Sequence, residues 1–455
     1  MKIVIVGAGK VGVALTRHLA VENRVTVIDQ NPHLVENIIN IYDVMGVCGN
    51  GASYDVQKEA DVEQADLLIA TTSSDEINIL TCLVAKKMGV QHTIARIRSP
   101  EYGRQLRFMR SELGLSMAIN PEAATAREIA RVLRFPTAMK LESFSKGRLE
   151  LVEYRVAEHT ALDGTRLSEL YRNFKVRVLI CAVARQGETI IPSGDFTLRA
   201  GDKIYLTAAP RELEKFFRLL GVFRARASSV MIVGASKMCY YLASELLEMG
   251  MSVKIIDQNE QRCVEMSEKL PRALVIVGDG TDSELLSEEG ISQTDAFVAI
   301  TGLDEANILM ALSAAKQSGD CCKVVAKINR KSLLELVSTE SLIDSVVSTG
   351  AVTTELILQY IRAMKNASAS KVKTLHRIVD EKVEALEFSV TPDISFAGVP
   401  LRDLNLKRGL LLAGIVRQTG QIVIPSGNDV LHLHDDVIVV TTDTQLEDLR
   451  DILAE

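Results

Sequence analysis

Apolar and polar positions alternate in blocks over the first hundred or so residues of the chain. Short apolar runs of strand length occupy residues 2–6, 25–29, 44–48, 67–71 and 93–97. Between the first two runs, Val11, Leu15 and Leu19 recur at intervals of four and give a helix one apolar face. Such alternation predicts βαβ units, and therefore an α/β fold with a doubly wound parallel sheet covered by helices on both faces.

After the βαβ pattern, the sequence changes to short strands separated by glycine turns. Residues 148–207 read as alternating strands, glycine turns and one short helix near 166–171, which predicts a small α+β domain. Within it, residues 195–206 read as a β-hairpin that turns at 200–202. The strand-and-helix pattern then returns, with strands expected near 230–233, 252–256, 274–277, 296–300 and 323–328. A second hairpin is expected at 429–439.

The two halves of the chain repeat one another. VTVIDQN at 25–31 recurs as VKIIDQN at 253–259, and RQGETIIPSGD at 185–195 recurs as RQTGQIVIPSGN at 417–428. A fixed offset of this kind indicates duplication of one structural unit. We therefore predict four domains: Rossmann-like N-terminal domains at 1–135 and 228–365, and small C-terminal domains at 136–223 and 366–455. The boundary between the copies falls in the polar segment 224–229.

A glycine-rich motif follows the first expected strand of the first copy. Gly7, Ala8, Gly9, Lys10, Val11 and Gly12 form a GxGxxG loop that opens a helix, and Asp29 ends the second strand. In this context the first glycine permits a tight turn, the second allows a pyrophosphate to approach the backbone, and the third allows close packing. The helix N-terminus offers free N–H groups to the phosphates. The motif predicts a dinucleotide site.

Asp29 identifies the expected dinucleotide. A carboxylate at this position accepts hydrogen bonds from the ribose hydroxyls and repels the 2′-phosphate of NADP, so NAD is favoured. Asn50 and the pair Thr71 and Thr72 follow later strands and reach the same crevice, although ordinary turn chemistry also explains them. Arg96 and Arg98 are candidates for phosphate contacts or for an interface.

The second copy departs from the glycine motif. Gly234 remains, but Ser236 and Cys239 replace the second and third glycines. Asp257 and Asp279 remain in place, so a ribose could still be held. We therefore expect a weaker, altered or empty second site.

Composition narrows the class of function. The chain has 455 residues, a formal net charge of −7, 4% aromatic residues and no Trp, which argues against nucleic-acid binding. No apolar stretch approaches the roughly 20 residues that span a bilayer. The seven cysteines include no CxxC pair and read as buried thiols of a reducing cytoplasm. The adjacent Cys321 and Cys322 lack further ligands at metal spacing, so no metal site is predicted.

Catalytic motifs are missing from the sequence. None of the seven histidines stands in a recognisable catalytic pattern, and neither a GxxxxGK[ST] loop nor a GxSxG elbow occurs. A hydride-transferring enzyme needs a proton-transfer group and substrate anchors. We therefore predict a nucleotide sensor that is not an enzyme, with an NAD-dependent oxidoreductase as the alternative.

The whole chain resembles the TrkA family, the regulatory subunits of bacterial Trk potassium uptake systems. The most specific elements are KIVIVGAGKVG at the start, the paired segments TTSSDEINIL and ITGLDEANIL, and ARIRSPEY at 95–102. The resemblance implies two tandem RCK units, each a Rossmann domain followed by an RCK-C domain. It assigns Gly7, Gly9, Gly12 and Asp29 to the dinucleotide motif and Asp257 to the second site, while Ser236 and Cys239 depart from the family pattern.

The resemblance also implies partners and a location. The family forms a cytoplasmic ring, peripheral at the inner face of the cell membrane, on a potassium-translocating integral membrane subunit. NAD(H) and adenine nucleotides such as ATP and ADP alter gating. A ring of eight RCK domains corresponds to a homotetramer of this chain. Control of a different ion channel, a purely structural ring, and the role of the C-terminal domains in dimer contacts or ligand binding remain open.

Overall fold

The computed structural model describes residues 1–100, 102, 113–135, 137, 139–145, 148–222, 227–319, 322–337, 343–365, 372–379, 382–443, 446 and 448–454. Cys321 and residues 224–226 of the predicted boundary lie outside these ranges. The chain forms two compact units, each assembled from both copies. The first holds Met1–Ala130 and Ser228–Leu356, and the second holds Arg131–Ala227 and Ile357–Glu455. In the described ranges, no helix is long and apolar enough to cross a membrane.

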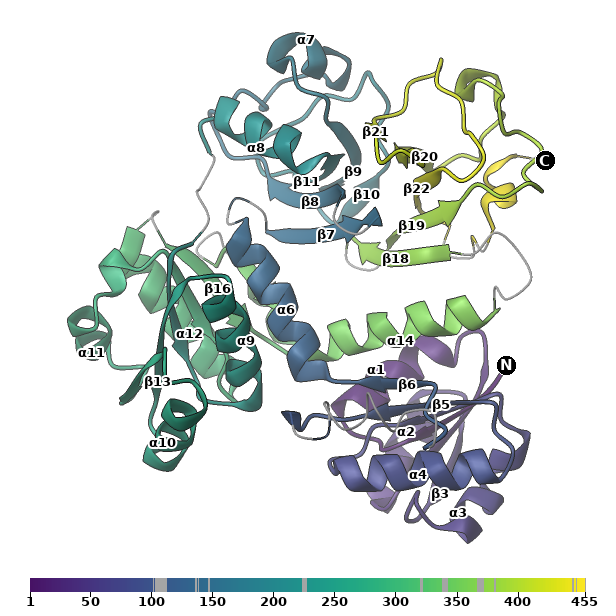
Figure 1. The fold of residues 1–455 in the computed structure, drawn as a ribbon, viewed down its shortest axis with the longest axis vertical. Helices are drawn as coiled ribbons and strands as arrows, with labels where there is room; N and C mark the ends of the chain where they lie inside the picture. Colours follow the sequence, from purple (N-terminus) through teal and green to yellow (C-terminus); the bar gives the residue numbers. More distant parts are fainter. Residues whose placement is uncertain are drawn as a thin grey trace. The chain divides into compact units, whose positions relative to one another are not determined.

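The N-terminal domain of the first copy is a six-stranded parallel sheet in the order β3-β2-β1-β4-β5-β6, which confirms the predicted doubly wound fold. Figure 1 shows this domain in purple to blue, with its strands β3, β5 and β6 labelled. Its strands are β1 (Lys2–Val6), β2 (Arg24–Asp29), β3 (Met45–Cys48), β4 (Leu67–Ala70), β5 (His92–Arg96) and β6 (Met117–Ile119). Its helical elements are α1 (Lys10–Leu19), α2 (Pro32–Ile41), α3 (Tyr54–Glu59), η1 (Val62–Gln64), α4 (Asp75–Lys87) and α6 (Pro121–Arg134).

The strand register brings three loops to one edge of this sheet. Val6, the last residue of β1, lies opposite Ile28 of β2 and Ala70 of β4. The order of strands reverses between β1 and β4, and open α/β sheets bind ligands outside the carboxyl ends of the strands at such a reversal. The glycine loop, Asp29 and Thr71 all follow these strand ends, so the predicted site residues gather where the fold favours a ligand.

The N-terminal domain of the second copy repeats this sheet in the order β14-β13-β12-β15-β16-β17. Its strands are β12 (Ser229–Val233), β13 (Ser252–Asp257), β14 (Leu274–Val277), β15 (Ala296–Ala299), β16 (Lys323–Lys327) and β17 (Ser345–Val347). Its helical elements are α9 (Lys237–Glu248), α10 (Glu260–Lys269), α11 (Ser283–Glu288), η4 (Ile291–Gln293), α12 (Asp304–Ser318), α13 (Lys331–Val337) and α14 (Thr349–Lys365). Apart from Ser229 at the start of β12, the central strands β12 and β15 are apolar and buried, as expected for a sheet covered on both faces.

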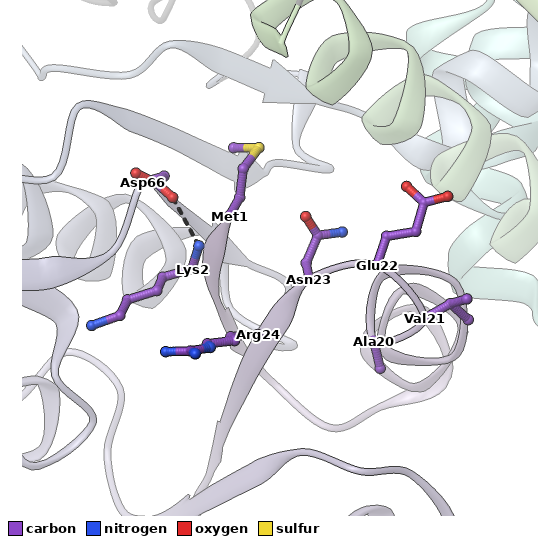
Figure 2. Close-up of a pocket in the computed structure, with 8 residues that line it drawn as sticks. All are labelled: Met1, Lys2, Ala20, Val21, Glu22, Asn23, Arg24 and Asp66. Atoms are coloured by element: carbon purple, nitrogen blue, oxygen red, sulfur yellow. Dashed lines mark hydrogen bonds between the residues drawn. The ribbon is translucent and has the colours of Figure 1, made fainter. Parts of the chain in front are cut away.

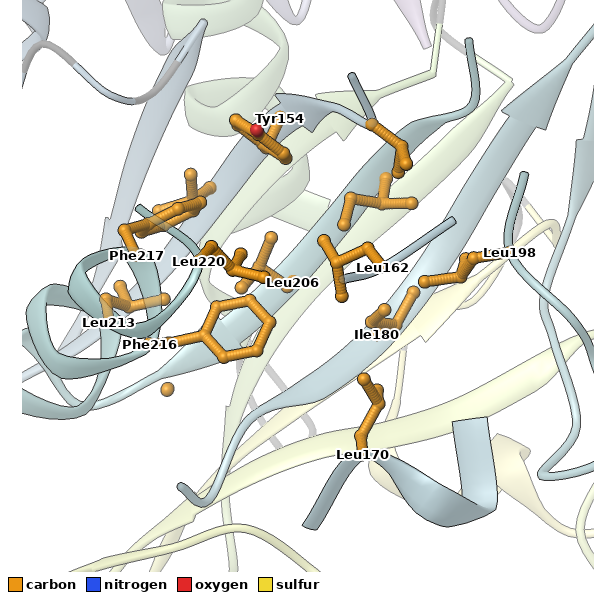
Figure 3. Close-up of a cluster of buried hydrophobic side chains, with 14 of the residues drawn as sticks. Tyr154, Leu162, Leu170, Ile180, Leu198, Leu206, Leu213, Phe216, Phe217 and Leu220 are labelled. Carbon is orange, nitrogen blue, oxygen red and sulfur yellow. The ribbon is translucent and has the colours of Figure 1, made fainter. Parts of the chain in front are cut away.

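The C-terminal domain of the first copy is a five-stranded antiparallel sheet in the order β10-β9-β11-β8-β7. Its elements are β7 (Lys140–Phe144), β8 (Leu149–Arg155), η3 (Leu167–Glu169), α7 (Leu170–Phe174), β9 (Leu179–Arg185), β10 (Glu188–Ile190), β11 (Lys203–Ala208) and α8 (Pro210–Leu219). Figure 3 shows Phe216 and Phe217 of α8 packed against the sheet, next to Leu206 and Ile180. The predicted α+β domain is confirmed.

The C-terminal domain of the second copy has the sheet order β18-β19-β22-β20-β21. Its elements are β18 (Val372–Ile378), β19 (Val383–Ser389), η6 (Leu401–Asp403), β20 (Leu410–Val416), β21 (Ile422–Val423), β22 (Asp436–Thr441) and η7 (Leu449–Ile452). No α-helix corresponding to α8 is present among its described residues.

One hydrophobic cluster is shared by the two C-terminal domains, and we call it the shared core. It contains Phe144, Leu149, Leu151, Cys181, Ala182 and Tyr205 from the first copy, and Ile378, Val379, Val383, Ala385, Ala413, Val416, Ile438 and Val440 from the second. All of these side chains are almost completely buried. Each sheet therefore covers an apolar face of the other, and the two domains form one folded body.

The two predicted hairpins are wrong. Residues 195–202 form turns, and β11 pairs instead with β8 and β9. The Asp202 carboxylate accepts hydrogen bonds from Arg185 Nε and Nη2, both at 2.7 Å, and from the backbone N–H of Arg199 at 2.8 Å. These bonds hold the segment as a turn. In the second copy Asp435 Oδ2 accepts from Arg417 Nη1 and from the backbone N–H of His432, and β22 pairs with β19 and β20.

A shallow hollow lies at the amino end of β1, at the opposite end of the strand from the glycine loop (Figure 2). It is lined by Met1, Lys2, Ala20, Val21, Glu22, Asn23, Arg24 and Asp66. Its main polar contact is the backbone N–H of Lys2, which donates to Asp66 Oδ2 at 2.8 Å. The hollow contains none of the predicted site residues, so it does not contribute to the candidate site.

Candidate nucleotide-binding site

The glycine loop of the first copy is shaped by close backbone packing. Gly7 has a φ of +104°, and a Cβ there would lie 2.9 Å from the backbone of Thr71 and Thr72. A Cβ on Gly12 would lie 1.8 Å from the carbonyl oxygen of Gly7. Both positions therefore require glycine for the loop to close. A Cβ on Gly9, by contrast, would meet no protein atom within 4 Å, so the space above this residue is open to a ligand.

The helix that follows the loop begins without a side-chain cap. Gly9 is the N-cap of α1 and has an extended backbone, and no side chain accepts from the first turn. The first N–H groups of a helix have no partner within the helix and carry its positive dipole end. Lys10 is exposed at this end, whereas Val11 is buried and contributes its backbone alone. This arrangement suits an anion.

The Asp29 carboxylate is bound to the loop itself. Its Oδ2 accepts the N–H of Ala8 at 2.6 Å, and its Oδ1 accepts the N–H of Asn31 at 2.8 Å. The Ala8 side chain is buried. Each carboxylate oxygen accepts more than one hydrogen bond, so two ribose hydroxyls still find acceptors. The N–H of Ala8 is already engaged and is not a phosphate donor in this conformation.

The side chains of Asn50, Thr71 and Thr72 make hydrogen bonds to neighbouring groups of the protein. Asn50 Oδ1 accepts the N–H of Ala52 at 3.1 Å, as in an ordinary Asx turn. The Thr71 hydroxyl lies 3.2 Å from the carbonyl oxygens of both Val6 and Gly7, so it fastens the end of β4 to the loop. Thr72 Oγ1 donates to Asn78 Oδ1 at 2.7 Å. These side chains border the site, and their observed bonds are structural.

A buried asparagine that the sequence reasoning missed organises this edge. Asn78 is fully buried on α4; its Oδ1 also accepts the N–H of Thr72 at 2.8 Å, and its Nδ2 donates to the carbonyl of Arg96 at 2.8 Å. Asn307 makes the same contacts with Thr301 and Lys327 in the second copy. The signal available in the sequence was the identical asparagine in the repeated segments INIL and ANIL.

The corresponding loop of the second copy caps its own helix. Ser236 Oγ accepts the N–H of Cys239 at 3.3 Å, and the N–H of Ser236 donates to the carbonyl of Gly234 at 3.0 Å. The buried Cys239 side chain occupies the position of Gly12, and burial raises the pKa of its thiol. Two groups that would face a phosphate are therefore already bonded within the protein.

The acidic residues of the second copy keep their places. Asp257 Oδ2 accepts the N–H of Ala235 at 2.7 Å and its Oδ1 accepts the N–H of Asn259 at 2.8 Å, as Asp29 does in the first copy. Asp279, the counterpart of Asn50, accepts from the backbone and hydroxyl of Thr281, which lowers the pKa of its carboxyl. The second copy thus retains the acidic residues that would bind a ribose, while the residues that would face a phosphate, Ser236 and Cys239, differ from those of the first copy.

Arg96 and Arg98 lie at the end of β5, between the site and the second copy. Arg96 Nη2 pairs with Glu122 at 3.5 Å, and burial lowers the pKa of the Arg96 guanidinium. The backbone N–H of Arg98 donates to Asp75 Oδ2 at 2.9 Å, and its carbonyl accepts the hydroxyl of Tyr241 at 3.1 Å. Of these contacts, only the one at the backbone carbonyl of Arg98 reaches the second copy, and the Arg96 side chain pairs within the first.

Comparisons with known proteins agree with this architecture. The TrkA-N domain model matches residues 3–121 and 230–349, and the TrkA-C domain model matches 151–221 and 385–454. Solved structures with the same fold include the RCK domain of GsuK, with a TM-score of 0.63 and 20% identity over 98% of this chain and 93% of that chain. The GsuK channel bound to NAD has the same TM-score and identity over 98% and 77%.

Curated relatives match nearly the whole chain. The Trk system potassium uptake protein TrkA homolog of Archaeoglobus fulgidus is 31% identical over 453 residues, which cover 99% of this chain and 100% of the relative. The Trk system potassium uptake protein TrkA of Vibrio alginolyticus is 32% identical over 448 residues, which cover 97% and 94%. With both family models matched twice in tandem, the chain belongs to the TrkA family.

Proposed function

We propose that this protein is a regulatory subunit that controls potassium uptake by binding NAD(H) in the N-terminal domain of its first copy. ATP and ADP compete for the same site, and the second copy binds nucleotides more weakly. The bound ligand favours one conformation of the assembly, and a potassium-translocating membrane subunit responds to that conformation. A ligand shifts such an equilibrium only through different affinities for the two conformations.

One observation carries the proposal: the glycine loop of the first copy is open at the place where phosphate would bind. Gly9 leaves space above an uncapped helix N-terminus, and Asp29 stands beside it with its carboxylate fixed by the loop. These are the elements that hold the pyrophosphate and the ribose of a dinucleotide in Rossmann folds. The acidic side chain disfavours the 2′-phosphate of NADP, which supports NAD as the ligand.

A regulatory role suits these groups better than catalysis. The residues assigned to the site in the first copy offer backbone N–H groups, amide and hydroxyl side chains, one carboxylate and one ammonium. They include no imidazole or thiol for general acid–base chemistry. The TrkA relatives are named as potassium uptake proteins, and structures of similar fold include the GsuK channel bound to NAD and GsuK bound to ADP.

Family membership supports extending the proposal to the assembly and the location. A homotetramer would bring together eight RCK units in one ring, and a ring at the inner face of the membrane would contact the pore-forming subunit from the cytoplasm. Light scattering of the purified protein measures the mass of the assembly. A mass of four chains supports the ring, and a monomer contradicts it.

Isothermal titration tests the binding proposal directly. The full-length protein is titrated with NADH, NADPH and ATP, beside the variants Asp29→Ala and Asp257→Ala. We expect Asp29→Ala to weaken NADH binding at least tenfold and Asp257→Ala to leave the tight NADH site intact. Binding of NADH that is unchanged by Asp29→Ala would place the site elsewhere and overturn the proposal. Consumption of NADH with any added carbonyl substrate would instead favour an enzyme.

A further inference from the structure

A single tyrosine joins the second copy to the candidate site of the first. Tyr241 lies on α9, and its hydroxyl donates to the carbonyl of Arg98 at 3.1 Å and accepts from Asn120 Nδ2 at 2.8 Å. Partial burial raises the pKa of the Tyr241 hydroxyl, so it remains a donor at neutral pH. Both N-terminal domains belong to the same compact unit, so this contact is part of its interior architecture.

The segment that Tyr241 contacts is also fastened to the nucleotide edge. The Asn78 side chain joins Thr72 to the carbonyl of Arg96, with hydrogen bonds of 2.7 to 2.8 Å. Two residues further on, Asp75 Oδ2 accepts the N–H groups of Arg98 and Ser99 at 2.9 and 2.8 Å. Hydrogen bonds, together with the short stretch of backbone from Arg96 to Arg98, therefore connect the loop after β4 to the hydroxyl of Tyr241.

Asn120 makes this connection stiffer. Its Oδ1 accepts the N–H of Ala123 in the first turn of α6, and its Nδ2 lies 3.3 Å from the carbonyl of Arg98 as well as 2.8 Å from Tyr241. The side chain is therefore fixed at both ends. A displacement of the Arg98 carbonyl cannot be absorbed by free rotation of Asn120, so it reaches α9.

Among the described residues, the hydrogen bond of Tyr241 has no counterpart at the equivalent position of α1. The repeat aligns Lys237 to Leu242 with Lys10 to Leu15, which places Ala14 at the position of Tyr241. A methyl group offers no hydrogen bond to the segment after β16. The counterpart of Asn120 is Ser348, which accepts the N–H of Ala351 at 3.4 Å in the first turn of α14. In the part of the chain that the structure describes, the tyrosine contact therefore joins the first site to the second copy, and Ala14 cannot make it in the other direction.

We propose that Tyr241 is a positioning residue that carries the ligand-bound state of the first nucleotide site to α9 of the second copy. The inference rests on the proposed function, because it needs a ligand at the first site. Binding at the loop after β4 moves Thr72 and Asn78, and the bonded segment around Arg98 then moves α9 through the tyrosine hydroxyl. The second copy, whose own phosphate loop is self-capped, acts as the receiver of the signal.

Hydrogen exchange of the full-length protein, with and without saturating NADH, tests this assignment. In the wild type we expect NADH to slow exchange in the glycine loop and in α9, the latter by roughly fivefold or more, the lower end of typical allosteric couplings. Tyr241→Phe removes only the hydroxyl. It is expected to keep the protection of the loop and the NADH affinity within threefold, while the ligand-dependent change in α9 disappears. Tyr241→Leu should give the same result.

Tyr240→Phe is the matched control, because the Tyr240 ring lies beside Tyr241 with centroids 5.6 Å apart. In Tyr240→Phe we expect NADH to slow hydrogen exchange both in the glycine loop and in α9, as in the wild type. A response of α9 in Tyr241→Phe equal to that of the wild type overturns the assignment. A wild type that binds NADH without any response in α9 also overturns it and leaves the proposed function intact. Absence of NADH binding to the wild type removes the proposed function and this inference together.

Discussion

The two N-terminal domains share a fold and an acidic residue, yet they differ at the start of the helix that follows the glycine-rich loop, which has a side-chain cap in the second copy and none in the first. Asp29 and Asp257 each accept one backbone N–H from their glycine loop and one from the asparagine two residues further on. The helix after the first loop begins uncapped at Gly9, whereas Ser236 caps the helix after the second loop. The acidic residue is therefore part of the loop's internal structure. Its presence alone does not identify a nucleotide site, and the state of the helix terminus is the more informative feature.

The largest effect is expected from making the first loop resemble the second at Gly12. In Gly12→Ala the new Cβ would collide with the carbonyl oxygen of Gly7, 1.8 Å away, so the loop must change shape. We expect NADH affinity to fall more than 100-fold and the free energy of unfolding to fall by about 1–3 kcal/mol, as for overpacked sites. Calorimetric titration and chemical denaturation measure the two quantities.

Gly302→Ala is the control for that experiment. A Cβ at Gly302 meets no atom within 4 Å, and the residue lies in the second copy. Binding and stability should both stay close to wild type. If Gly12→Ala bound NADH as tightly as this control, the close packing of the first loop would have no role in ligand binding.

The next effect separates binding from stability. Gly9→Ser introduces the cap that Ser236 provides in the second copy, and its Cβ has open space in the protein. We expect NADH affinity to fall roughly 10- to 100-fold, while the melting temperature stays level or rises slightly, because Ser is a better N-cap than Gly by a few tenths of a kcal/mol. Differential scanning calorimetry with and without NADH shows both changes. A drop in stability together with binding would point to distortion of the loop.

The reciprocal variant Ser236→Gly removes the cap in the second copy. Cys239 remains in its buried position, so the loop keeps its altered shape. We expect no gain of a second tight NADH site, and a stoichiometry of one NADH per chain. A stoichiometry of two in this variant would show that Ser236 alone closes the second site.

A smaller effect, with a similar loss of stability in both copies, is expected from substituting the equivalent asparagines Asn78 and Asn307. Asn78→Ala and Asn307→Ala each remove a fully buried side chain that satisfies several backbone groups. Each should lower the free energy of unfolding by about 2 kcal/mol, because buried partners are left without hydrogen bonds. Only Asn78→Ala should also weaken NADH, by less than tenfold. Equal loss of NADH binding in both variants would mean that the copies are not functionally distinct.

The smallest effect concerns the exposed glutamates that begin α4 and α12. Hydrogen bonds from Ser74 and Tyr102 lower the pKa of Glu76 to about 2, and Arg330 lowers the pKa of Glu305. A depressed folded-state pKa contributes stability above the unfolded value of 4.5 that is lost as the pH falls towards the folded value. We expect about 0.5 M salt to raise the pKa of Glu305 more than that of Glu76, because salt screens exposed charges.

Nuclear magnetic resonance titration of the two carboxyl carbons measures these pKa values. Ser74→Ala should raise the pKa of Glu76 and leave that of Glu305 unchanged. The second copy has Leu303 in place of Ser74, so it cannot make the same bond. An equal response of both glutamates to salt would indicate that charge, and not the serine hydroxyl, controls Glu76.

The fold was largely predictable from the sequence, because the periodicity of apolar residues indicated the helices and strands and the internal repeat indicated the duplication. The five strands predicted for the first sheet begin and end within a residue of the apolar runs, since a buried parallel strand is largely apolar, while the sixth strand, β6, was not predicted. The hairpins at 195–206 and 429–439 were wrong, because the bidentate pair of Arg185 with Asp202 and the single bond of Arg417 Nη1 to Asp435 hold turns that a strand pattern does not reveal.

The candidate site was predictable in part. Gly7, Gly9, Gly12 and Asp29 lie where the motif indicates, because spacing along a strand–turn–helix unit fixes their geometry. Asn78 and Tyr241 were not predicted as site residues, since their contacts join segments far apart in the sequence. The cap that Ser236 forms in the second loop was also visible only in the structure. The sequence shows that a serine replaces the glycine, but it does not show which N–H group the serine binds.

The shared core has a consequence for the synthesis of the chain. Phe144, Leu149 and Tyr205 emerge from the ribosome early, but the strands that cover them lie at residues 378–440. At elongation rates of about 5 to 20 residues per second the gap lasts roughly 10 to 50 seconds, which is long compared with the folding of a small domain. The first C-terminal sheet therefore waits with an apolar face exposed, and a chain truncated after the first copy should associate with itself or occupy chaperones.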